Sequence, residues 1–175
     1  MSRAEGKTPI QELSDEHVVI MDGLEMVRAA MSVVEQTKRQ TPARTWETLQ
    51  QAVASLAREF DKHLLKEEEA LFPAVEAHLG AEGGPTEVMR MEHEDLREGM
   101  WELRRLVGES EAPEGVYEQL GETTEALGNL LVEHTHTEHH IFFPMAEALL
   151  TDAERTEMAQ KFRRIEEEQE GRRSG

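Results

Sequence analysis

Residues 63–73 read HLLKEEEALFP, and residues 134–144 read HTHTEHHIFFP. Both stretches place a histidine and a glutamate four residues apart, and both reach a Phe-Pro pair at the same offset. Residues four apart on an α-helix project in nearly the same direction, so each His-Glu pair faces one point. The two stretches therefore predict two helices that carry matching polar pairs.

The apolar residues around these pairs recur every three or four positions, which is the period of one helix face. Four such stripes run through residues 10–34, 49–71, 89–107 and 116–145. The last stripe is expected to include Ile141. Histidines and glutamates occupy slots within the stripes that would otherwise hold core residues. Because no segment alternates as a strand does, the stripes predict an all-α protein.

The order of the stripes predicts an up-down-up-down four-helix bundle with a short extra C-terminal helix. Glycines and a proline at 80–85 mark the clearest loop, between two helix pairs. Residues 152–170 carry Met158, Phe162 and Ile165 on one side, which would let this helix lie across the bundle. A length of 175 residues favours one domain over residues 1–175, with a core bundle at about 10–150.

Composition and charge disfavour several classes of partner and of enzyme. The formal charge of −18 disfavours partners such as nucleic acids and anionic membrane surfaces. No apolar stretch approaches the length of a membrane span or a signal-peptide core, so a cytoplasmic location is expected. The chain has no cysteine, and any metal must therefore be bound by imidazole and carboxylate groups. Glycine-rich phosphate loops and Ser-His-Asp arrangements are not evident, which disfavours nucleotide enzymes and hydrolases.

The two halves of the chain resemble each other outside the two quoted stretches as well. A Glu-His pair precedes a glycine by the same interval at residues 16–23 and 92–99. Four antiparallel helices related by this duplication would bring six polar side chains to one level. The predicted metal ligands are His17, His63, Glu67, His93, His134 and Glu138.

Any one of these histidines, taken alone, is better explained as a hydrogen-bonded core imidazole. Two buried carboxylates accompanied by four histidines are difficult to explain as packing, because buried charges need compensation. Six such ligands exceed the needs of one tetrahedral zinc, whereas two octahedral irons bridged by both carboxylates use them fully. His136 and His140 share another face, which is expected to be solvated.

At these residues the chain resembles the hemerythrin-like family, also called the HHE cation-binding domain. The resemblance rests on His17, on His93 and on the two His-x-x-x-Glu motifs with their following Phe-Pro, and it covers about residues 10–150. It implies an up-down four-helix bundle and a cofactor of two iron ions with a bridging oxo or hydroxo group. It also implies that Glu67 and Glu138 are the bridging carboxylates.

One departure from the oxygen-carrying members of that family bears on function. They place a further histidine one turn after the third-helix ligand, where this chain has Arg97, and the first-helix equivalent is Met21. Each iron would then keep an open position. Arg97 either points inward to stabilise a bound anion or extends outward to pair with Glu94 or Glu98.

These features predict a protein that binds or senses a small ligand such as oxygen, peroxide or nitric oxide at a non-haem di-iron centre. A non-catalytic iron store, donor or iron-responsive interaction module is the alternative, and a helical module with vestigial ligands is a third. A homodimer or an unknown protein partner is compatible with the sequence.

Overall fold

Helices make up the secondary structure of the computed structural model, which describes residues 7–37, 43–109, 112 and 115–171. No strand occurs in these ranges, so the all-α prediction is confirmed. The elements in chain order are α1 (Pro9–Gln36), α2 (Ala43–Lys66), the π-helical turn η1 (Glu67–Leu71), α3 (Phe72–Leu79), α4 (Pro85–Leu106), α5 (Val116–Thr137), the π-helical turn η2 (Glu138–Phe142), α6 (Phe143–Leu149) and α7 (Asp152–Gly171).

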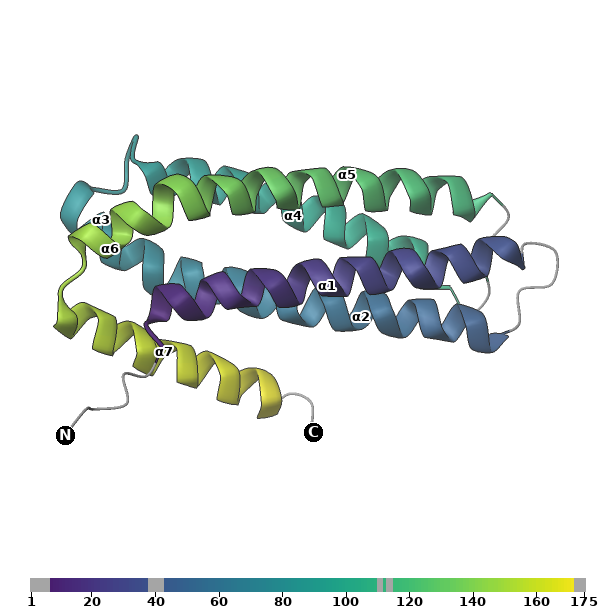
Figure 1. The fold of residues 1–175 in the computed structure, drawn as a ribbon, viewed down its shortest axis with the longest axis horizontal. Coiled ribbons are helices and arrows are strands. Elements are labelled where there is room, and N and C mark those ends of the chain that lie inside the picture. The colour runs from purple at the N-terminus through teal and green to yellow at the C-terminus, as the bar shows by residue number, and fades with distance from the viewer. Residues whose placement is uncertain (1–6, 38–42, 110–111, 113–114, 172–175) are drawn as a thin grey trace.

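The four long helices α1, α2, α4 and α5 lie alongside one another, and consecutive helices point in opposite directions (Figure 1). Helix α1 packs on α2 and α5, and α4 packs on α5 and α2. Helix α7 contacts α1, α2 and η1, and it follows the lower side of the pair α1 and α2 in Figure 1. Its apolar residues Met158, Phe162 and Ile165 are buried, as their position on one side of this helix predicts.

Two apolar clusters form the core, one along the four long helices and one beside η1, η2, α3 and α6. On α1, for example, Leu13 belongs to the second cluster and Ile20 to the first, and His17 lies between them. On α4, His93 likewise lies between Met89, which belongs to the second cluster, and Leu96, which belongs to the first. The polar side chains therefore sit at one level, where both apolar clusters end.

Each quoted His-Glu stretch passes from α-helix into a π-helical turn at its glutamate. The backbone N–H of Phe72 donates to the carbonyl of Glu67, and the N–H of Phe143 donates to that of Glu138, five residues earlier in both cases. Pro73 follows immediately in the first copy, and a proline has no N–H and crowds the carbonyl four residues before it. Wide turns of this kind are frequent at functional sites.

The extra residue in η2 makes one sequence expectation wrong. Ile141, assigned to the fourth apolar stripe, is 63% exposed, while Phe142 is buried in its place. A π-helical turn holds more residues than an α-helical turn, so the buried face advances by one position. The α-helical period used for the stripe could not register this shift.

The duplication extends from sequence into packing. A Cβ atom placed on Gly23 would lie 3.2 Å from Leu56 Cδ1, and one placed on Gly99 would lie 3.2 Å from Leu127 Cδ1. Leu56 and Leu127 are themselves equivalent positions of the two repeats. Small residues thus let α1 approach α2, and α4 approach α5, in the same way.

Every helix in the described ranges is too short or too polar to cross a lipid bilayer.

Candidate metal centre

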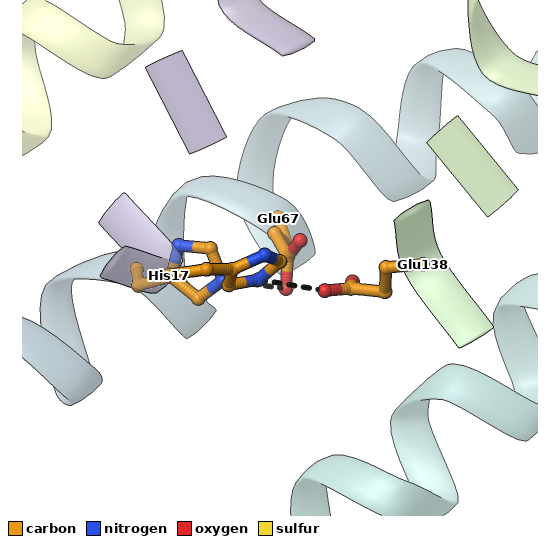
Figure 2. Close-up of side chains that lie close together, drawn as sticks. His17, Glu67 and Glu138 are labelled. Carbon is orange, nitrogen blue, oxygen red and sulfur yellow. Dashed lines mark ion pairs between the residues drawn. The ribbon is translucent and has the colours of Figure 1, made fainter. Parts of the chain in front are cut away.

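All six residues that the sequence predicts as metal ligands come together inside the structure. Figure 2 shows three of them, His17 from α1, Glu67 from η1 and Glu138 from η2, with their polar ends turned toward one another. His17 Nε2 lies 2.8 Å from Glu138 Oε2. His63, at the end of α2, is 2% exposed and Glu67 is fully buried. The helices thus converge on one polar spot in an apolar interior.

The six side chains divide into two groups that share both glutamates. One group holds His17 and His63, which we call the first half-site, and the other holds His93 and His134, the second half-site. Within each group the ligand atoms, including those of Glu67 and Glu138, lie within 4.8 Å of one another. A metal in each group would therefore have two imidazoles of its own, and two carboxylates in common with its neighbour.

Hydrogen bonding leaves the inner atoms of these groups unsatisfied. The Nε2 atoms of all four histidines and both carboxylate oxygens of each glutamate are buried without a hydrogen-bond partner. The closest contact, between His17 Nε2 and Glu138 Oε2, lacks hydrogen-bond geometry despite its length of 2.8 Å. Buried polar atoms are paired in the great majority of cases. Eight unpaired atoms facing one point are the arrangement that metal ions would satisfy.

The pKa values of the buried histidines and glutamates are compatible with metal binding by the same residues. Burial lowers the pKa of His63 to about 4 and lowers that of His93, so these imidazoles are neutral and keep a lone pair. Burial, reinforced by the nearby Glu138 carboxylate, raises the pKa of Glu67 well above its usual range. Two carboxylates so close in a dry interior repel each other, and a cation between them would remove that repulsion.

Hydrogen bonds from outside the centre fix how two of the histidines are oriented. His63 Nδ1 donates to Glu16 Oε2 at 3.0 Å, and His134 Nδ1 donates to Glu92 Oε2 at 2.7 Å. A proton on Nδ1 leaves the Nε2 lone pair directed inward. Glu16 and Glu92 each precede a predicted ligand on α1 or α4 at equivalent positions, so the sequence repeat contained this signal.

The two remaining histidines have unlike outer partners. His93 Nδ1 donates to Glu68 Oε1 at 2.8 Å, and Glu68 also pairs with the Arg97 guanidinium at 2.8 Å. His17 Nδ1 instead lies 2.8 Å from Nε2 of His139. Arg97 is 44% exposed and does not enter the centre. The outward alternative for Arg97 therefore holds, although its partner is Glu68 and not Glu94 or Glu98.

Lys66, which no sequence motif singles out, supports the first half-site. Lys66 is fully buried, and its Nζ lies 2.6 Å from Glu12 Oε1, 2.5 Å from Glu16 Oε1 and 2.7 Å from Glu166 Oε1. Burial alone would lower the pKa of Lys66, but the hydrogen bonds that its ammonium group donates to these carboxylates raise the pKa, so Lys66 stays charged. Lys66 thereby joins α7, through Glu166, to the carboxylate that orients His63.

The donor set accounts for which metals fit. Imidazole nitrogen and carboxylate oxygen suit iron, manganese or zinc, and six protein ligands shared between two positions suit octahedral metals better than tetrahedral zinc. His136 and His140 lie outside this set, exposed and stacked on each other with ring centroids 4.1 Å apart, as expected for a solvated face.

Comparison with known proteins points to the same kind of site. The family model described as hemerythrin HHE cation binding domain matches residues 8–146. An iron-sulfur cluster repair protein YtfE from Edwardsiella ictaluri is 38% identical over 96 residues, which cover 53% of this chain and 43% of that protein. The protein of that name from Musicola paradisiaca is 26% identical over 141 residues, covering 78% of this chain and 62% of the relative. The chain thus spans about half the length of these relatives.

Proposed function

Because the chain belongs to the hemerythrin HHE cation-binding domain family, we propose that its buried histidines and glutamates ligate two iron ions. His17 and His63 would hold one iron, His93 and His134 the other. The observation that carries the proposal is the set of eight buried, unpartnered nitrogen and oxygen atoms directed at one point. No hydrogen-bonding role explains them together.

Glu67 and Glu138 belong to both groups, and for that reason we propose them as the bridging carboxylates. With two imidazoles, two carboxylate oxygens and an oxo or hydroxo bridge, each iron would keep room for about one further ligand. We propose that these positions bind small ligands such as oxygen, peroxide or nitric oxide. The irons would supply open coordination sites and one-electron redox chemistry.

The chain's own residues keep this centre dry and hold its histidines in place. The Phe143 ring stacks on His17 with centroids 5.6 Å apart, and the Phe72 ring lies over His93 at 5.2 Å. Phe72 also meets Phe142 edge-on at 5.5 Å. Excluding water in this way strengthens electrostatic interactions at the metals and protects bound ligands from competing reactions. Small, uncharged ligands would enter such a site more easily than large ones.

The test is reconstitution of the metal-free protein with ferrous iron under anaerobic conditions, followed by titration with oxygen, peroxide and nitric oxide. We expect the visible spectrum to change with at least one of them. Glu67→Gln protein treated identically is the control, since it keeps the side-chain shape and loses the shared charge. A spectrum that none of the three ligands alters would contradict the proposal.

A second candidate is an iron donor or store. It is favoured by the name of the relatives, iron-sulfur cluster repair protein, because replacing lost iron in a cluster requires a source of iron. Incubation of the iron-loaded protein with an apo-ferredoxin and sulfide would test it. Transfer of iron faster than from free ferrous iron at equal concentration supports a donor, and retention of both irons excludes one.

We further infer that α1, α2, α4 and α5 form the up-down-up-down four-helix bundle that the stripes predict. Their side-by-side packing and reversed directions support this. We likewise propose one domain over residues 1–175 with a core at about 10–150, which the contacts among the described helices support. The cytoplasmic location and a homodimer or protein partner stay predictions.

A further inference from the structure

The internal repeat is broken at two positions next to the metal centre. Counting from the shared glutamates, Lys66 in the first copy corresponds to Thr137 in the second, and Glu68 corresponds to His139. These are positions immediately before and after Glu67 and Glu138, on the π-helical turns or at their edges. The two half-sites therefore differ in the residues that stand behind their ligands.

His139 gives the first half-site a neutral partner where the second has a carboxylate. For His17 to bind a metal through Nε2, its Nδ1 must carry the proton and donate to His139 Nε2 at 2.8 Å. His139 Nε2 also lies 3.3 Å from the hydroxyl of Ser14. A carboxylate that accepts from a ligand histidine makes the imidazole a stronger donor to the metal, and a neutral imidazole does so much less.

The two outer partners also differ in exposure, because His139 is more exposed to solvent than Glu68. His139 lies at the surface, where water competes for its hydrogen bonds, whereas Glu68 is 19% exposed and is held by Arg97. His93 is fully buried, while His17 is 5% exposed. The hydrogen bond that orients His93 is thus charge-assisted and enclosed, and the one that orients His17 is neutral and open to solvent.

Lys66 adds to the difference from the other side. Its ammonium group lies 2.5 Å from Glu16 Oε1. The positive charge offsets part of the negative charge of the carboxylate that accepts a hydrogen bond from His63. Glu92, the equivalent partner of His134, has no lysine or arginine within ion-pair distance among the described residues. Glu68 does have a cation, Arg97, but that arginine is 44% exposed and screened by water, unlike the buried Lys66.

We propose that the two metal positions are not equivalent, and that His139 makes the His17–His63 position the one that binds its metal more weakly and exchanges it first. This inference rests on the proposed function, in which the six residues hold two metals. His139 acts as a positioning residue through His17 and does not itself bind the metal. A centre with one firmly held and one exchangeable iron would suit a protein that delivers iron as well as one that binds ligands.

The test is an anaerobic titration of the metal-free protein with cobalt(II), followed by visible absorption and by competition with a chelator. The parent is expected to bind two equivalents in separate steps, with affinities about tenfold or more apart, since altered partners of ligand histidines typically change metal affinity about 10- to 100-fold. His139→Glu should tighten the weaker step about tenfold and bring the two steps together. Circular dichroism checks that each variant keeps its helices.

His136→Glu is the matched control, because it adds the same charge within one turn of His139 but lies on the exposed face with His140. It should leave the separation of the two steps unchanged. Glu68→His is the reciprocal variant, which should weaken the tighter step.

Two equal affinities in the parent would overturn the inference. So would a separation that His139→Glu leaves intact, or one that His136→Glu alters as much. Uptake of fewer than two cobalt ions by the folded parent would contradict the proposed two-metal site itself, and that outcome is distinct from equal binding of two.

Discussion

The first and second half-sites present the same groups to the metal centre, two histidine Nε2 atoms each and a share in Glu67 and Glu138, yet different groups stand behind them. Helix packing is also repeated, with Gly23 against Leu56 and Gly99 against Leu127. The halves diverge in the outer partner of one histidine each, which is His139 for His17 and Glu68 for His93. A duplicated scaffold can thus keep one set of inner groups while the partners that orient them change.

The largest effect is expected where the half-sites overlap. Glu67→Gln removes a carboxylate that belongs to both groups, so both metals should bind more than about 100-fold more weakly, beyond the usual effect of changing an outer partner. Metal content after gel filtration measures the loss. The metal-free variant should unfold at the same or a higher temperature, because it no longer buries a carboxylate whose pKa is raised by burial. Retention of both metals would show that Glu67 is not shared.

Removal of one histidine from each half-site tests whether the halves are separate. His63→Ala should leave the second half-site able to bind one metal, and His134→Ala should leave the first able to do so. Metal analysis of both variants, each prepared from the same reconstitution, gives the stoichiometry. If either variant still holds two metals as tightly as the parent, the assignment of that histidine is wrong.

Lys66 and Thr137 occupy equivalent positions but should differ in their effect on stability. Lys66→Met leaves Glu12, Glu16 and Glu166 facing one another without their cation, and we expect a loss of about 2–3 kcal/mol in the free energy of unfolding, discounted for the partial exposure of those carboxylates. Thr137→Val should cost less than about 0.5 kcal/mol. Urea denaturation of the metal-free proteins measures both, and equal losses would contradict the role given to Lys66.

The smallest difference is expected between the two packing glycines. An alanine at Gly23 or Gly99 gains up to about 1 kcal/mol in helix propensity, which crowding against a leucine methyl group at 3.2 Å offsets. The two variants should therefore match within about 0.5 kcal/mol in free energy of unfolding, whatever their common sign. A clear disagreement between them would mean that the repeat in sequence is not a repeat in packing.

Much of the fold could be predicted because burial on helices follows a period that the sequence displays. His17 and His93 stand in core slots of their stripes, and the structure buries both. The position of Ile141 could not be predicted in the same way, because Ile141 lies inside the π-helical turn η2, which changes the period locally. The sequence feature that accompanies this turn is the Phe-Pro pair at the end of each His-Glu stretch.

The outer partners were harder to predict because they depend on contacts between helices distant in sequence. From the sequence alone, Lys66 looks like a surface residue. Its partners Glu12, Glu16 and Glu166 come from α1 and α7, which lie far from it in the sequence. His139 lies within a run of histidines, and only the packing of α1 singles it out as the neighbour of His17. The six predicted ligands can be recognised in the sequence because they repeat in its two halves, whereas Lys66 and His139 cannot, because they have no counterpart of the same kind in the other half.

The claim that the six residues hold a bridged pair of irons is tested most directly by Mössbauer spectroscopy of protein reconstituted with iron-57 and oxidised to the diferric state. We expect two irons per chain with a diamagnetic ground state in an applied field, since the shared Glu67 and Glu138 and an oxo or hydroxo bridge would couple their spins. One iron per chain, or two that show independent paramagnetic spectra, would contradict it.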